Sequence, residues 1–440
     1  MSQPSYLKPS ANLVYTETLP SSPFASPNPE GRAVPGPPPR CFYLYFPYLH
    51  FDTYLNVIRR RKLVEKRLSR GRASPVPQYV EDLESLEMKV IWEYIGFDPP
   101  LNSRRTLDQF ALPSLRDTHA RDDDQMLYKL TKQKPKKQKR PAGSSHWSRK
   151  DEGGDWPRRR SGSSKAPSMM ESDGDSDEAS DLDIDVDVRD GKILMVDQLW
   201  LWAIDTNTLA TFFPYRHSSP KEGVLYQEAD LRNSIYNELN GDLTDRSENA
   251  YDLAAFMVLH AVTVFIERST HPDLDIFKIF EEAIGLLAER MTANMKRFRT
   301  QNFIGMGDDS SDDEYFGRSK AISIKKRHKR ELEKAERENR ENTSALLELR
   351  DLEDELNTLQ RLFDIQEATI LNMKALYTTP ELVEITRNGQ AYLDKSLEYM
   401  AENKGLTSEM LKRVDTTRKD VSCYPVPFET GEQKVTNKTR

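Results

Sequence analysis

Cysteines and long apolar runs are both scarce in this chain of 440 residues. The two cysteines, Cys41 and Cys423, lie far apart in the sequence, which excludes a disulfide framework and a cysteine-based metal centre. The longest uncharged apolar run, Leu253 to Ile266, is shorter than the roughly 20 residues that a membrane-spanning helix needs. The N-terminal residues also lack the basic and apolar pattern of a secretory signal. We therefore expect a cytoplasmic chain without a membrane span, associated with a membrane only as part of a longer product.

Common catalytic motifs are absent as well. The sequence contains no GxSxG motif, no GxxxxGK[ST] phosphate-binding loop and no HExxH zinc motif, and its seven histidines have no ligand spacing. We therefore predict no catalytic residue and no metal ligand from the residues themselves, and we expect that the chain is not an enzyme.

The chain is unusually polar. Charged residues make up 31% and hydrophobic residues 37% of it, against about 25% and 45–50% in a typical soluble domain. This composition predicts long disordered segments. They are the proline-rich residues 1–40, the insertion 131–190 with its opposed basic and acidic blocks, the acidic linker 306–320 and the polar tail 415–440.

Two basic runs in the insertion, Lys134–Pro141 and Arg158–Arg160, fit a nuclear-import signal or a nucleic-acid contact. No aromatic platform accompanies them, and the acidic block beside them would compete with phosphate. A solvated linker is therefore favoured, nucleic acid is not the expected partner, and a nuclear location stays open.

The stretch from Gly191 to Arg216 is typical of a β-hairpin with a turn at Asp205–Asn207. Its first run, Ile193 to Ile204, is apolar on both faces, which predicts a strand buried inside a sheet. We assign four of its residues to the structural core: Asp197, Gln198, Trp200 and Trp202.

Helical patterns surround this hairpin. They predict a helix over Gln78–Gly96, a short helix over Glu228–Leu239 with a left-handed cap at Gly241, and a buried helix over Leu253–Ile266 that Ser247 begins. His260 in that helix fits a hydrogen-bonded core histidine better than a metal ligand. The acids Asp122–Asp124 fit the N-terminus of a helix that begins near Met126 better than a metal site.

A second long pattern lies in the C-terminal half. Leu349, Leu352, Leu356, Leu359, Phe363, Gln366, Ile370, Met373 and Tyr377 alternate steps of three and four residues, with Gln366 as the one polar residue. Four heptads of this kind predict a coiled-coil or partner seam within a long helical stalk over 321–414. A helix from a second subunit, or Glu381–Val414 folding back, would cover the seam.

Six phrases resemble, in the same order, the fungal branch of the CorA-like divalent-cation transporters. They are RRTLDQF (Arg104 to Phe110), RDDDQMLYK (Arg121 to Lys129), MVDQLWLWAID followed by FFP, SIYNELNGD (Ser234 to Asp242), FEEAIGLLAERMTANMKRFR (Phe280 to Arg299) and LLELRDLEDELNTLQRLFDIQ (Leu346 to Gln366). The resemblance implies an αβα-type cytosolic α/β domain over 41–130 and 191–305, followed by a coiled-coil stalk. It also implies Mg²⁺ or another divalent cation as ligand. In that family the long helix forms the inner stalk of a pentamer, so a homo-oligomer or a full-length membrane paralogue is the implied partner.

The sequence departs from the family after Val414, where neither an apolar span nor the Gly-Met-Asn pore motif follows. Gly305–Gly307 precede acids and are not that motif, so no pore residue can be transferred. Two hypotheses remain. The chain is the cytosolic region of a truncated or degenerate CorA-like transporter that cannot conduct ions alone, or it is a scaffold or regulator that uses the seam and the charged linkers.

Overall fold

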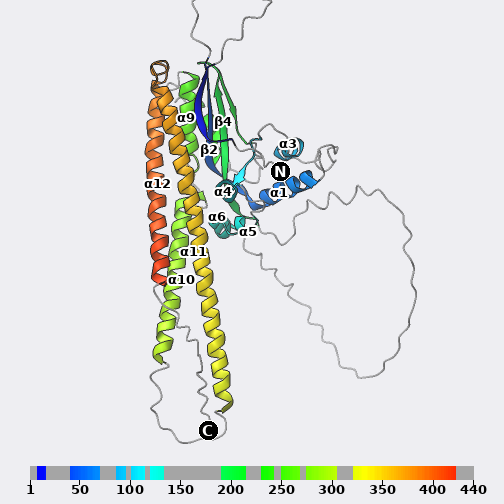
Figure 1. Ribbon diagram of the computed structural model, residues 1–440, viewed down its shortest axis with the longest axis vertical. Helices are drawn as coiled ribbons and strands as arrows, with labels where there is room; N and C mark the ends of the chain where they lie inside the picture. The colour runs from blue at the N-terminus through cyan, green and yellow to red at the C-terminus, as the bar shows by residue number, and fades with distance from the viewer. Residues whose placement is uncertain are drawn as a thin grey trace, which may run out of the picture.

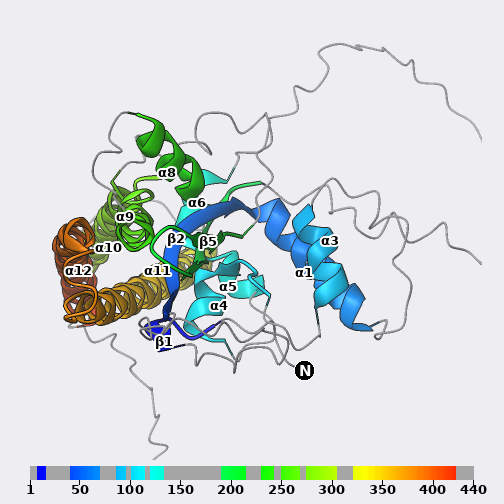
Figure 2. The same cartoon turned by 90° about the horizontal axis from the view of Figure 1, so that it is seen from above.

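The computed structural model places an antiparallel sheet between two groups of helices (Figures 1 and 2). The strand order is β1–β2–β4–β3, and β5 also pairs with β4. The strands are β1 (Ser10–Tyr15), β2 (Arg40–Thr53), β3 (Arg105–Thr106), β4 (Lys192–Ala203) and β5 (Leu209–Phe212). The structure describes residues 7–15, 40–69, 86–95, 101–113, 119–132, 190–214, 229–241, 249–267, 274–304 and 321–422.

β4 and β5 form the hairpin that the sequence predicts. In its turn the carboxylate of Asp205 accepts hydrogen bonds from the N–H of Asn207 at 2.7 Å and the hydroxyl of Thr208 at 3.1 Å. β4 is buried from Ile193 to Leu201 because it lies between β2 on one side and β3 and β5 on the other. The predicted burial is wrong at its end, where Trp202 is only half-buried.

β1 corrects the prediction that all of residues 1–40 are disordered. It pairs with β2 in a register that runs from Ser10 opposite Tyr45 to Tyr15 opposite Arg40. Its alternating side chains Ala11 and Leu13 pack into the main core, which explains why this short run forms a strand. Residues 1–6 and 16–39 lie outside the described part of the chain.

Long helices cover one face of the sheet (Figure 2). They pack on alternate residues of β2 and β4, among them Phe42, Leu44 and Leu201. α9 is buried on nearly every side, as its apolar sequence predicts. The helices of this group are α9 (Ala250–Thr263), α10 (Ile276–Ile304), α11 (Ala321–Tyr377) and α12 (Arg387–Ser422), with α8 (Leu231–Asn240) beside α9.

Two helix ends differ from the prediction. Asn249 caps α9 by accepting the N–H groups of Tyr251 and Asp252, both at 2.9 Å. The predicted cap, Ser247, lies outside the described residues. Gly241 does cap α8, but its φ of −91° is not left-handed.

A second, smaller group of helices lies on the other side of the sheet (Figure 1). α1 (Tyr54–Ser69) packs Tyr54, Val57 and Ile58 on Ile193 and Met195 of β4. α3 (Leu86–Tyr94) packs against α1 and forms the described part of the helix predicted over 78–96. The remaining short helices are α4 (Leu107–Ala111), α5 (His119–Asp122) and α6 (Met126–Thr131), of which α4 packs against α11 and α6 against α10.

The charged insertion leaves and re-enters the fold at adjacent positions. The N–H of Lys192, at the start of β4, donates to the hydroxyl of Thr131, at the end of α6, at 2.8 Å. The predicted disorder of the insertion concerns residues 133–189, which lie outside the described residues, as do 305–320. The segments before and after the insertion therefore share one folded unit.

α11 and α12 lie side by side as a helical hairpin (Figure 1). This confirms the return helix predicted over Glu381–Val414, although α12 begins at Arg387 and continues to Ser422. The tail predicted to be disordered from residue 415 is therefore helical at its start.

Candidate functional site

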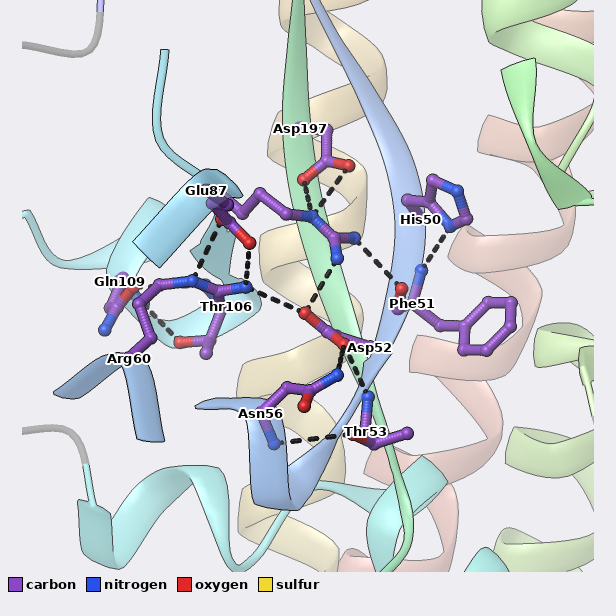
Figure 3. Close-up of polar contacts among 11 residues, drawn as sticks. His50, Phe51, Asp52, Thr53, Asn56, Arg60, Glu87, Thr106, Gln109 and Asp197 are labelled. Atoms are coloured by element: carbon purple, nitrogen blue, oxygen red, sulfur yellow. Dashed lines mark hydrogen bonds and ion pairs between the residues drawn. The ribbon is translucent and has the colours of Figure 1, made fainter. Parts of the chain in front are cut away.

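Five charged side chains meet in the interior where β2, β4, α1 and α3 come together (Figure 3). Asp52, Arg60, Glu87, Arg104 and Asp197 form this buried charge network. The side chains of Asp52, Arg104 and Asp197 are only 5%, 2% and 1% exposed. Because an unpaired buried charge is costly, the fold depends on how well these groups match one another.

Arg104 lies in the extended segment before β3 and connects three acceptors. Its Nε donates to both carboxylate oxygens of Asp197 at 2.9 and 3.1 Å, and its Nη1 donates to Asp52 Oδ2 at 2.7 Å. Its Nη2 donates to the carbonyl of Phe51 at 2.9 Å. Burial opposes the charged form, but the carboxylates of Asp197 and Asp52 outweigh it and raise the pKa of Arg104. The planar guanidinium group carries five N–H donors in fixed directions, so an arginine can donate to all three acceptors at once, which a lysine cannot do in this geometry.

Arg60 of α1 brings α3 into the same network. Its Nε and Nη2 donate to the two carboxylate oxygens of Glu87 at 3.0 and 3.1 Å, and Nη2 also donates to Asp52 Oδ2 at 2.9 Å. The other oxygen of Asp52 accepts the N–H of Thr53 at 2.8 Å and the side-chain amide of Asn56 at 3.1 Å. Asp52 is therefore the shared acceptor that links α1 to the sheet.

The network is built to hold segments together. Three carboxylates against two guanidinium groups leave one net negative charge, and each carboxylate already accepts hydrogen bonds. Within the described residues no group of three or more His, Cys, Asp or Glu side chains could hold a metal ion. The chemistry of the network is thus ion pairing between parts of the chain that are up to 93 residues apart.

A second polar contact joins α11 to the α5–α6 segment. Glu355 of α11 accepts the N–H of Met126, at the start of α6, at 2.9 Å. Burial raises the pKa of Glu355 well above its ordinary value. Gln125, beside Met126, accepts the N–H of Leu194 in β4 at 3.0 Å. The α5–α6 segment is therefore held on one side by α11 and on the other by the sheet.

The predicted seam residues of α11 are all buried within the chain. Each is at most 1% exposed, and the set comprises Leu349, Leu352, Leu356, Leu359, Phe363, Ile370, Met373 and Tyr377. The sheet, α10 and α12 pack against α11, and the Tyr377 hydroxyl donates to the carbonyl of Tyr251 in α9 at 2.6 Å. The return helix therefore covers the stripe together with the sheet, and none of these eight residues is left exposed. A homo-oligomer through the helical stalk stays a prediction.

A serine, a histidine and a glutamate meet between α8 and α9. His260 is fully buried, with Ser234 Oγ 2.9 Å from its Nδ1 and Glu238 Oε2 3.2 Å from its Nε2. Ser234 lies inside α8 and its N–H donates to the carbonyl of Asp230 at 2.9 Å, so it has no backbone donor to offer a reacting oxyanion. The arrangement holds α8 on α9, which agrees with the interpretation of His260 as a core histidine.

The acids Asp122–Asp124 lie just before α6, which begins at Met126, as the sequence predicts. Asp122 ends α5 and is paired with Arg61 at 2.7 Å, and Asp124 is paired with Lys129 at 3.2 Å. They bind cations of the chain itself.

The four residues assigned to the structural core have different surroundings. Asp197 and Gln198 are both 1% exposed, and the Gln198 side chain accepts the indole N–H of Trp200 at 2.8 Å. Sequence reasoning missed Arg104, the ion-pair partner of Asp197, and the rest of the network, because nothing in the pattern singles out Asp52, Arg60 or Glu87. The one signal was an acid inside a buried strand, which requires a buried cation.

Comparison with known proteins adds no relative. No family model, no curated protein and no solved structure matches the chain. Among the described helices none combines the length and the apolar character that crossing a membrane requires.

Proposed function

We propose that the chain is the cytosolic region of a CorA-like divalent-cation transporter, acting in Mg²⁺ transport or its regulation and unable to conduct ions alone. One observation carries the proposal: the phrases that resemble that family contact one another in the fold. Arg104 of RRTLDQF pairs with Asp197 of MVDQLWLWAID. Glu355 of LRDLEDEL accepts the N–H of Met126 in RDDDQMLYK.

These contacts support the proposal because the phrases are far apart in the sequence. Met126 and Glu355 are separated by 229 residues, and Arg104 and Asp197 by 93. Phrases that resemble one family in order and also form one core are the expected signature of a shared domain. The proposal assigns no ion ligand, because the described residues contain no cluster that could hold a metal.

The first experiment measures cation binding by the full chain. A regulatory domain that binds Mg²⁺ in the folded state should melt at a higher temperature in MgCl₂ than in NaCl of equal ionic strength. Sedimentation of the same samples would show whether Mg²⁺ changes the assembly with a second copy or with a membrane paralogue. An identical melting temperature in both salts, with unchanged sedimentation, would refute a cation-sensing role.

A second experiment addresses transport. Sequencing the transcript beyond the codon for Arg440 distinguishes a frame that continues into two apolar spans from one that stops. A continuing frame would support the transporter, and a stop codon would favour the alternative function.

That alternative is a scaffold or regulator, with a cytoplasmic or nuclear location. Because the seam is buried, such a protein would bind partners elsewhere. One uncharged aromatic surface of the sheet, on the side opposite α9 and α11, favours this second function.

A further inference from the structure

Aromatic side chains gather on the half of the sheet where β2 begins and β4 ends, on the side opposite the long helices. Tyr43, Tyr45, Trp200, Trp202 and Phe212 form this aromatic face. They alternate with the core residues of their strands, so their side chains point away from α9 and α11. The register places Tyr43 opposite Trp202 and Tyr45 opposite Trp200, with Phe212 opposite Trp200 on the next strand.

The rings form one continuous surface. The Tyr45 ring centroid is 6.0 Å from that of Trp200 and 5.7 Å from that of Trp202, and Trp202 is 5.2 Å from Phe212. These three pairs meet edge to face, with interplanar angles of 74°, 78° and 90°, so neighbouring rings stand steeply to one another along the face. Tyr43, 5.3 Å from Tyr45, extends the row toward β1.

The described helices leave this face uncovered. α1 and α6 pack on Ile193 and Met195 at the other end of β4, and no residue of the aromatic face belongs to a helix-packed core. Phe212 is 53% exposed and Trp202 is half-buried, whereas Trp200 is buried with 8% exposure. The indole N–H of Trp202 has no hydrogen-bond partner among the described residues, so it is a donor available at the centre of the face.

The chain itself contains a segment of suitable chemistry beside this face. Residues 16–39 connect Tyr15 of β1 to Arg40 of β2, two residues that lie directly opposite each other in the sheet. The segment has eight prolines in 24 residues and ends in PGPPP, four residues before Tyr43. Proline-rich sequences bind rows of tyrosine and tryptophan, because the proline rings fit between the aromatic rings and the backbone carbonyls accept from an indole N–H.

We propose that the aromatic face binds the proline-rich segment 16–39 of the same chain. The tether supports an occupant in cis, because both ends of the segment are fixed at the edge of the face and give it an effective concentration near the millimolar range. Even weak recognition suffices at that concentration. The five side chains of the face carry no cation, which disfavours a nucleic-acid strand as the occupant.

The test uses the full chain in two forms. In one form residues 16–39 are natural, and in the other a Gly/Ser sequence of equal length replaces them. A synthetic peptide of residues 16–39 is titrated into both by calorimetry, beside a control peptide in which Pro35, Pro37, Pro38 and Pro39 are alanine. Trp202→Ala and the milder Phe212→Ala are made in the Gly/Ser form, with Tyr236→Ala, on the exposed surface of α8, as the matched aromatic control.

We expect the natural peptide to bind the Gly/Ser form, and the natural chain to bind it at least about tenfold more weakly because its own segment competes. Trp202→Ala and Phe212→Ala should weaken binding, by about tenfold for the tryptophan, while Tyr236→Ala leaves it unchanged. Equal binding to both forms would show an open face and overturn the occupant in cis. Binding to neither form, or equal binding of the alanine peptide, would overturn proline recognition. A dimer that the Gly/Ser replacement dissociates would assign the segment to a second copy instead.

Discussion

Arg104→Met tests whether the buried charge network stabilises the fold. The substitution keeps an unbranched side chain of similar length but removes the four hydrogen bonds that Arg104 donates to Asp197, Asp52 and the Phe51 carbonyl. The network then holds three carboxylates against one guanidinium group, so its net charge changes from −1 to −2 within the interior.

The expected cost follows from burial. Removing one partner of a buried ion pair costs about 3–5 kcal/mol, because the remaining charge stays buried without compensation. Arg290→Met is the matched control, since the Arg290 and Glu348 side chains are 54% and 31% exposed where they pair at 3.5 Å. An exposed pair of this kind contributes about 0–1 kcal/mol. The difference between the two variants therefore isolates burial from the loss of an arginine.

Urea unfolding followed by circular dichroism measures both costs, and tryptophan fluorescence follows the sheet separately. Adding Asp197→Asn to Arg104→Met removes one of the unmatched charges, so the double variant should be more stable than the two single costs together predict. If Arg104→Met costs no more than Arg290→Met, water or a neighbouring group compensates the carboxylates, and the buried charge network does not stabilise the fold.

Three further predictions follow from other contacts. Gly389→Ala should destabilise the chain by roughly 1–3 kcal/mol in a thermal melting experiment, because the new Cβ would lie 2.9 Å from Asp252 Oδ1. Gly405→Ala in the same helix is the control: its Cβ would have no atom within 4 Å, so the substitution should be neutral or stabilising. Because burial raises the pKa of Glu355, its contribution to stability is present at low pH and is lost as the pH rises above the ordinary range of a glutamate. Glu355→Gln should therefore gain stability relative to the natural chain as the pH rises above about pH 5, and a parallel pH dependence would contradict this. Replacing residues 133–189 by a short Gly/Ser bridge should leave the melting temperature nearly unchanged, since the insertion ends are hydrogen-bonded neighbours; a large decrease would show that the insertion is part of the core.

The elements that the sequence predicts well are those whose pattern is local. β4 is apolar on both faces and is buried on both for most of its length, and α9 is apolar all round and lies inside the helical layer. β1 escaped prediction because only Ala11 and Leu13 pack inward in a region otherwise rich in proline. Its stability comes from pairing with β2, which no local pattern encodes.

The buried charge network could not be predicted for a related reason. Arg60 lies inside a basic run of α1 that resembles a solvated helix face, and Glu87 lies in the first turn of α3. Their burial depends on Asp52 and on Arg104, which the fold brings from two other segments. A charge pattern read along one helix cannot reveal a partner that another strand supplies.

The seam of α11 shows how one polar residue can indicate what covers a helix. A heptad stripe fits equally well against a second helix or against a sheet, because both present apolar side chains at similar spacing. Gln366 interrupts the stripe, and its side-chain amide donates to the carbonyl of Pro47 in β2 at 2.8 Å. In a partner helix the backbone carbonyls already accept hydrogen bonds from N–H groups of the same helix. On β2, by contrast, pairing with β1 stops at Tyr45, so the carbonyl of Pro47 can accept the Gln366 amide. A buried glutamine in a heptad seam therefore favours a strand edge over a partner helix.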